Sequence, residues 1–251
     1  MQQLQGRDLQ LVVTRLPKAV RAMLMDDGML CLGGGFIRAT IAAERPSDID
    51  IFGNADQQLE LAAYKLSVKQ RARIHKTDNA WTVLNHPRTA VQFIKRWLFQ
   101  GAEAVVKSFD FTICQAVIWW DASAGMVDAE GHFKGLWRSA CSDAFYPDLA
   151  ARRLVYTAPK RNEDAGGSIL RVRKYVSRGY SIQAPSLAAV IARMIRDLDL
   201  TKLKLTDEAR VAQILTGLLR EVDPLLIVDG LEFVDEHELG QVIAEQMEAP
   251  A

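Results

Sequence analysis

Apolar residues recur at helical spacing in the first part of the chain and at strand spacing soon after it. Between Leu11 and Met25 they fall three or four positions apart, which predicts one helix that ends before Gly28. The segment "SDIDIF", residues 47–52, alternates polar and apolar residues instead. A period of two predicts a strand with one buried face.

The same criteria assign the remaining elements. Before residue 121 they predict strands at 29–32, 90–97 and 109–120, a hairpin at 72–85, and helices at 36–44, 54–70 and 101–107. After Gly131 strand patterns largely stop, and helices are predicted at 146–156, 166–178, 186–198, 206–222 and 236–248. We therefore expect an α+β fold, with a mixed β-sheet domain over residues 1–140 and an all-helical domain over residues 141–251.

The composition is that of a globular chain, with 49 % apolar and 25 % charged residues among 251. Because 31 basic side chains balance 31 acidic ones, any nucleic acid must be bound by a local patch. The first ten residues lack the layout of a signal peptide, and no apolar run reaches the roughly 18 residues of a membrane span. The three cysteines are not in metal-binding spacing. We expect a cytoplasmic protein without a membrane partner.

Three consecutive glycines, Gly33 to Gly35, follow the strand at 29–32 and precede a predicted helix. A dinucleotide-binding turn would need a third glycine where Arg38 stands, and a P-loop would need Gly-Lys-Ser/Thr. Both motifs are absent. The backbone N–H groups of such a turn, next to a helix N-terminus, still suit a phosphate group.

Asp48 and Asp50 stand two residues apart on a predicted strand, so their carboxylates project from one face about 6 to 7 Å apart. Two like charges so placed attract a divalent cation. Asp110 lies between two phenylalanines in another predicted strand, where a charge is costly unless it faces a ligand or solvent. Three carboxylates on neighbouring strands beside a phosphate-binding turn indicate a nucleotidyl-transfer site with two magnesium ions.

These residues carry a resemblance to a known superfamily. "GGFIR" from Gly34 followed by Asp48-Ile49-Asp50 resembles the head of the DNA polymerase β-type nucleotidyltransferases, most of all the tRNA nucleotidyltransferase (CCA-adding) and bacterial poly(A) polymerase family. "DFTICQAVIWW" from Asp110 resembles a strand of that family, and "MVDAEG" resembles the hairpin that follows it. "ILRVRKYVSRGY", residues 169–180, resembles its neck helix.

The resemblance implies a magnesium-dependent enzyme that transfers a nucleotide from a nucleoside triphosphate. It implies that Asp48 and Asp50 ligate magnesium, and that Asp110 either completes the metal site or contacts the ribose. It further implies triphosphate contacts by Gly34, Gly35 and Arg38, and a head–neck cleft lined by Arg171 and Lys174.

Three hypotheses for the function stay open: two differ in the acceptor of the nucleotide, and the third has no acceptor. An RNA 3′ end, tRNA-like, is favoured because the neck segment and a stretch with eight basic residues between Arg152 and Arg178 would lie on its path. In the second hypothesis, the acceptor is a protein side chain or a small molecule. The third is a catalytically degenerate regulator that binds nucleotide or RNA, because Ala39 and Ser108-Phe109 depart from the family pattern.

Overall fold

The computed structural model describes residues 1–84, 89–127, 133–159, 165–196, 207–212, 226–228 and 231–233. The chain divides into two compact units, Met1–Ala151 and Arg152–Ala251. In the described part of the chain, no helix combines the length and the apolar character that crossing a membrane requires.

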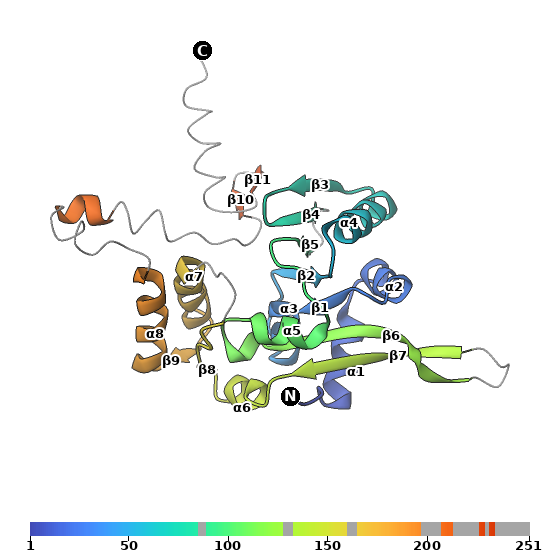
Figure 1. Ribbon diagram of the computed structural model, residues 1–251, viewed down its shortest axis with the longest axis horizontal. Coiled ribbons are helices and arrows are strands. Elements are labelled where there is room, and N and C mark those ends of the chain that lie inside the picture. The colour runs from blue at the N-terminus through green and yellow to red at the C-terminus, as the bar shows by residue number, and fades with distance from the viewer. Residues whose placement is uncertain are drawn as a thin grey trace, which may run out of the picture. The chain divides into compact units, whose positions relative to one another are not determined.

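The first unit is built on a seven-stranded mixed sheet, and this confirms the predicted α+β head (Figure 1). The strand order is β3-β4-β5-β2-β1-β6-β7, with β2 parallel to β5 and every other pair antiparallel. The strands are β1 (Cys31–Gly33), β2 (Asp48–Phe52), β3 (Arg73–Lys76), β4 (Ala80–Leu84), β5 (Ala90–Ile94), β6 (Ala116–Val127) and β7 (Phe133–Cys141).

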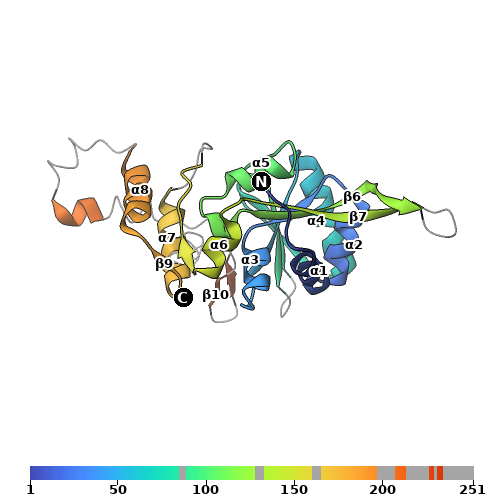
Figure 2. The same ribbon diagram turned by 90° about the horizontal axis from the view of Figure 1, so that it is seen from below.

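Helices cover both faces of this sheet. Those of the first unit are α1 (Gly6–Arg15), α2 (Lys18–Asp26), α3 (Gly35–Ile41), α4 (Asp56–Gln70), α5 (Ala102–Ser108) and α6 (Phe145–Ala150), with a 3₁₀ turn, η1, at Thr112–Cys114. Figure 2 shows α5 on one side of the β6–β7 hairpin and α1 and α3 on the other.

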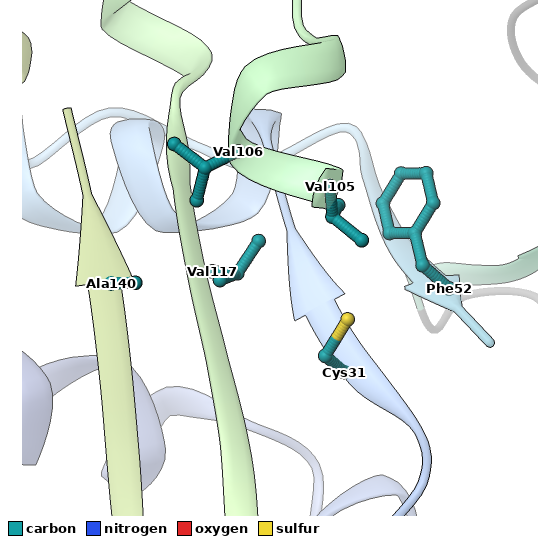
Figure 3. Packing of buried hydrophobic residues seen from close by; sticks show 6 residues of the cluster. All are labelled: Cys31, Phe52, Val105, Val106, Val117 and Ala140. Atoms are coloured by element: carbon teal, nitrogen blue, oxygen red, sulfur yellow. The ribbon is translucent and has the colours of Figure 1, made fainter. Parts of the chain in front are cut away.

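The face under α5 contains an apolar cluster. Val105 and Val106 of α5 pack against side chains of four strands, β1, β2, β6 and β7 (Figure 3). The strand residues of this cluster are Cys31, Phe52, Val117 and Ala140. Because side chains alternate along a strand, Asp48 and Asp50 share this face with Phe52, and Ile49 and Ile51 are buried on the opposite one.

Two predicted elements of the head differ from the structure. The single helix expected at 11–25 is two helices, because Pro17 restricts Leu16 to an extended conformation and α2 starts after it. The strand expected at 109–120 begins only at Ala116, so Asp110 precedes it in an irregular segment.

Strand β7 was not predicted. Gly135 allows the close approach of the Trp120 ring, since a Cβ there would lie 2.7 Å from Trp120 Cζ2. Trp120 and Trp137 then stack edge to face across β6 and β7, with ring centroids 5.5 Å apart. The sheet therefore continues to Cys141, and the boundary expected at residue 140 falls inside β7.

The second unit contains α7 (Ala165–Val176) and α8 (Ala184–Ile195), which pack together. It also contains two strand pairs, β8 (Arg153–Leu154) with β9 (Ser181–Ile182) and β10 (Leu226–Val228) with β11 (Leu231–Phe233). The expected all-helical character of residues 141–251 is therefore not confirmed. The helix predicted at 236–248 lies outside the described residues.

Candidate functional site

The two carboxylates of β2 form the centre of the candidate site. Asp48 is buried and Asp50 is partly exposed, and both extend from the face of the sheet that α5 covers. Ser47 donates a hydrogen bond from its hydroxyl to Oδ2 of Asp48 at 3.0 Å. The strand therefore presents two oxygen-donor side chains on one face, as the sequence pattern predicts.

The glycine turn lies directly beside these carboxylates. Gly33 is the cross-strand partner of Asp50, and a Cβ on Gly35 would lie 3.8 Å from Asp48 Oδ1. Gly34 has a φ of +74°, which permits the sharp exit from β1 into α3. Its N–H donates to the carbonyl of Ala116 at 3.1 Å, so this amide stabilises the turn within the sheet.

Phe109 covers the same turn. Its ring would meet a Cβ on Gly33 at 2.9 Å and a Cβ on Gly34 at 2.9 Å. A side chain at either position would therefore collide with this ring, independently of any ligand. The glycines thus have a packing role in addition to the phosphate-binding role predicted for Gly34 and Gly35.

Arg38 is only 1 % exposed, and its Nη1 forms an ion pair with Oε2 of Glu44. The guanidinium is therefore held next to a carboxylate at the C-terminal end of α3. Its predicted contact with a triphosphate stays a prediction, and it would have to occur beside this ion pair.

Asp110 is buried between α5 and η1. In the parts of the chain that the structure describes, no three His, Cys, Asp or Glu side chains are gathered as a metal site would require. Asp48 and Asp50 are therefore not joined by Asp110 in such a group. The metal and ribose roles of Asp110 stay predictions.

A row of polar residues extends from Asp50 across the sheet. Gln92 on β5 lies opposite Asp50, Thr82 on β4 lies opposite Gln92, and His75 on β3 lies opposite Thr82. Cross-strand neighbours on one face have Cβ atoms about 4.5–5.5 Å apart. Thr82 is fully buried, and its Oγ1 has no hydrogen-bond partner among the described residues.

This row was missed at the sequence level, although Thr82 and Gln92 each interrupt an apolar run, "AWTVL" and "AVQFI". As the single polar residue of the apolar run "AVQFI", Gln92 could have been recognised as a polar residue inside a buried strand. Its position beside Asp50 depends on the pairing of β2 with β5 across about 40 residues, which no local pattern encodes.

Arg171 and Lys174 lie on α7 of the second unit, and Arg171 donates from Nη2 to Oγ of Ser168 at 3.2 Å. Their assignment to a cleft beside the head stays a prediction.

The fold and the site together define a class. A seven-stranded mixed sheet, with Asp-x-Asp on β2 beside a glycine turn, fits the head of a nucleotidyltransferase.

Solved structures of CCA-adding enzymes are similar to this chain in fold. A Thermotoga maritima CCA-adding enzyme in complex with tRNA has a TM-score of 0.51 and 18 % identity, over 89 % of this chain and 52 % of that one.

A CCA-adding enzyme in complex with CTP has a TM-score of 0.50 and 16 % identity, over 87 % of this chain and 51 % of that one. This chain thus spans about half the length of these enzymes. None of the curated proteins is similar enough in sequence to match.

The model of the Gabija anti-defense 2 family matches residues 5–152, and the chain belongs to this family. The match covers nearly the whole first unit, including both β2 carboxylates and the glycine turn. The expectation from the sequence is thus confirmed for the fold of the head, whereas the family shown is Gabija anti-defense 2.

Proposed function

We propose that this protein is a nucleotidyltransferase that transfers a nucleoside monophosphate from a nucleoside triphosphate to an acceptor hydroxyl. The observation that carries the proposal is the position of the glycine turn beside Asp48, with 3.8 Å between a Cβ on Gly35 and Asp48 Oδ1. A triphosphate on the turn would thereby have its reacting phosphorus next to the two carboxylates.

The residues present fit magnesium, which binds proteins through one or two carboxylates together with substrate phosphates. Asp48 and Asp50 would hold it, and the bound ion would neutralise charge on the triphosphate and on the leaving pyrophosphate. Asp48 is oriented by the Ser47 hydroxyl and by the register of β2. Gly35 presents no side chain between the turn and this carboxylate.

In the reaction, the acceptor oxygen forms a bond to the α-phosphorus of the nucleoside triphosphate. The bond between that phosphorus and the oxygen that bridges it to the β-phosphorus breaks. Pyrophosphate leaves with the bonding electron pair, and the acceptor hydroxyl releases its proton to solvent water. The protein supplies positioning and charge complementarity, which contribute most of the catalysis in phosphoryl transfer.

We propose an RNA 3′ end as the acceptor. The support is the basic stretch from Arg152 to Arg178, part of which forms α7, and the resemblance of residues 169–180 to a neck helix. The similarity in fold to CCA-adding enzymes is in keeping with it.

A protein acceptor is the second candidate, and membership of the Gabija anti-defense 2 family favours it. A protein that counteracts a defence could do so by modifying a defence protein with a nucleotide. The ion pair of Arg38 with Glu44 favours the third hypothesis, a regulator that binds without turnover, because that arginine already has a carboxylate partner.

The test uses each of the four nucleoside triphosphates, labelled at the α-phosphate or at the γ-phosphate, with magnesium and with cellular RNA and protein fractions. Nucleotidyl transfer predicts α-label but no γ-label in the acceptor. Label in RNA supports the proposed acceptor, and label in protein supports the second candidate.

An Asp48→Asn, Asp50→Asn variant should abolish the transfer. Asp78→Asn is the matched control, because Asp78 is an exposed carboxylate in the turn between β3 and β4. Undiminished transfer by the double variant would refute the assignment of these carboxylates. Binding of triphosphate by the wild type without transfer to either fraction would refute the enzyme and leave the regulator.

A further inference from the structure

A hollow of about 910 Å³ lies in the first unit, beside the N-terminal end of α5 (the α5 hollow). Its size is within the range of about 300–1,000 Å³ that is usual for small-molecule sites. Gly53 lines it and directly follows β2, whereas Asp48 is the first residue of that strand. At about 3.3 Å per residue along a strand, these two positions are about 16 Å apart. The α5 hollow is therefore separate from the candidate site.

The strands next to the α5 hollow place a small residue between two aromatic ones. Cys31 on β1 is paired with Phe52 on β2 and with Trp119 on β6 (Figure 3). Phe99 packs on Phe52, with ring centroids 6.0 Å apart, and both Phe99 and Trp119 line the hollow. Strands β2 and β6 are two strand spacings apart, about 9–10 Å. Because stacked atoms lie about 3.5–4 Å apart, one planar ring fits between the aromatic side chains.

The polar lining of the α5 hollow is mostly neutral. Asn54 and Gln100 line it, and their carboxamides have no hydrogen-bond partner in the described part of the chain. A carboxamide offers a donor and an acceptor side by side, as the edge of a nucleobase requires. Glu103 is the one charged side chain among the described residues of the lining, and it is paired with Lys107 at 3.8 Å. The lining thus suits a neutral ring and offers a phosphate no cationic side chain.

We infer that the α5 hollow is a binding site for the base of a nucleoside. The ring stacks between Phe99 and Trp119, and its edge forms hydrogen bonds with Asn54 and Gln100. A ligand of this size gains about 0.3 kcal/mol per non-hydrogen atom, which corresponds to a dissociation constant on the order of 100 μM. This inference does not depend on the proposed activity.

A series of packed rings connects the α5 hollow to the glycine turn. Phe99 contacts Phe52, and Phe52 contacts Phe109 edge to face, with ring centroids 5.6 Å apart. Phe109 in turn covers Gly33 and Gly34. A base stacked on Phe99 restrains this series of rings, so its binding should stiffen the turn. The α5 hollow is therefore an effector site for the turn as well as a binding site.

The first measurement is isothermal titration calorimetry of the whole chain with adenosine, guanosine, cytidine and uridine, each up to about 2 mM and without magnesium. At least one nucleoside should bind with the affinity given above. Trp119→Ala should weaken that binding about tenfold or more, because it removes one stacking partner of the base. Absence of binding by all four nucleosides would overturn the inference.

Variants at the hollow wall test the hydrogen bonds and do not depend on the folding of Trp119→Ala. Asn54→Leu and Gln100→Leu keep the size of the side chain and remove its polar groups, so each should weaken binding about tenfold. Gln57→Leu is the matched control, because Gln57 is an exposed carboxamide on α4 that does not line the hollow. Undiminished binding by both wall variants, or equal weakening by the control, would overturn the assignment to the α5 hollow.

The candidate site is a second place where a nucleoside could bind, and one variant separates the two. Asp48→Asn, Asp50→Asn should bind the nucleoside as tightly as the wild type does. Binding that is lost in this double variant but kept in Trp119→Ala would place the nucleoside at the candidate site and overturn the inference.

Hydrogen exchange of the backbone amides of residues 33–38 tests the connection to the turn. With about 2 mM nucleoside bound, their exchange in the wild type should slow by about three- to twentyfold, the upper limit being set by the ratio of ligand concentration to dissociation constant. In Phe109→Leu the nucleoside should bind equally well, but the slowing at the turn should be lost because the last ring of the series is absent. Unchanged exchange at the turn of the nucleoside-bound wild type, or equal slowing in Phe109→Leu, would overturn the effector role.

Discussion

Alanine substitutions at Gly33 and Gly34 should separate the packing role of the glycine turn from its conformational role. A Cβ at Gly33 would lie 2.9 Å from Phe109 Cζ, and 3.2 Å from Phe52 Cε2 and from Val117 Cγ1. A Cβ at Gly34 would meet only Phe109, at 2.9 Å, but its φ of +74° is also unfavourable for alanine. The two variants thus share a collision with one ring and differ in backbone strain.

The expected magnitudes follow from these contacts. Overpacking costs about 1–3 kcal/mol, and the reduced entropy of the unfolded chain offsets about 0.4–1 kcal/mol of it. Gly33→Ala should therefore destabilise the fold by about 1–2 kcal/mol. Gly34→Ala carries a further strain of about 1–3 kcal/mol, which brings its expected cost to about 3 kcal/mol.

Urea unfolding followed by far-ultraviolet circular dichroism measures both costs, in the wild type and in a Phe109→Leu background. The smaller leucine should relieve most of the penalty at Gly33. At Gly34 it should relieve the collision and leave about 2 kcal/mol of strain. Complete rescue at both positions, or rescue at neither, would refute the division into collision and strain.

Three further outcomes are expected. Glu44→Gln removes the carboxylate partner of the buried Arg38 and should lower the free energy of unfolding by about 3 kcal/mol. Adding Arg38→Met should recover most of this loss, because no unpaired charge then stays buried. Both free energies are measured by urea unfolding, and a double variant without recovery would mean that the lost ion pair is not the cause of the destabilisation. Gln92→Glu places a third carboxylate beside Asp50 and should tighten magnesium binding about tenfold in isothermal titration calorimetry; unchanged or weaker binding would show that the row from Gln92 does not extend the site. Burial raises the pKa of the Cys31 thiol from 9.0 to about 12. The contribution of this thiol to the free energy of unfolding is therefore constant below pH 9 and falls as the pH rises from 9 toward 12, because only the unfolded chain releases the thiol proton in that range. Cys31→Ala should lose that part of the pH dependence of unfolding, and an unchanged slope would contradict the shift.

The local patterns of the sequence were sufficient for much of the head. The alternation in "SDIDIF" placed Asp48 and Asp50 on one strand face, and β2 spans residues 48–52 as a result. The apolar positions of 54–70 predicted α4 nearly to its ends. Both depend on contacts between residues a few positions apart, so the sequence holds the required information within a short window.

The errors arose where distant segments meet. Strand β7 is formed because β6 supplies its partner and Gly135 admits the Trp120 ring, neither of which is visible in the pattern after Gly131. Asp110 has the neighbours of a strand residue, but its segment turns into η1 before β6 begins. In each case tertiary packing overrode the local preference.

The sequence by itself determined the strand that carries the two aspartates, the glycine turn before it and the resemblance of both to a nucleotidyltransferase. Only the tertiary structure decided that Gly33 lies opposite Asp50, that Phe109 covers the turn, that Glu44 holds Arg38 and that Gln92 continues the row beside Asp50. The reason is physical: periodicity reports which face of an element is buried, whereas the neighbours on that face are set by strand order and register, which bring together residues far apart in the chain.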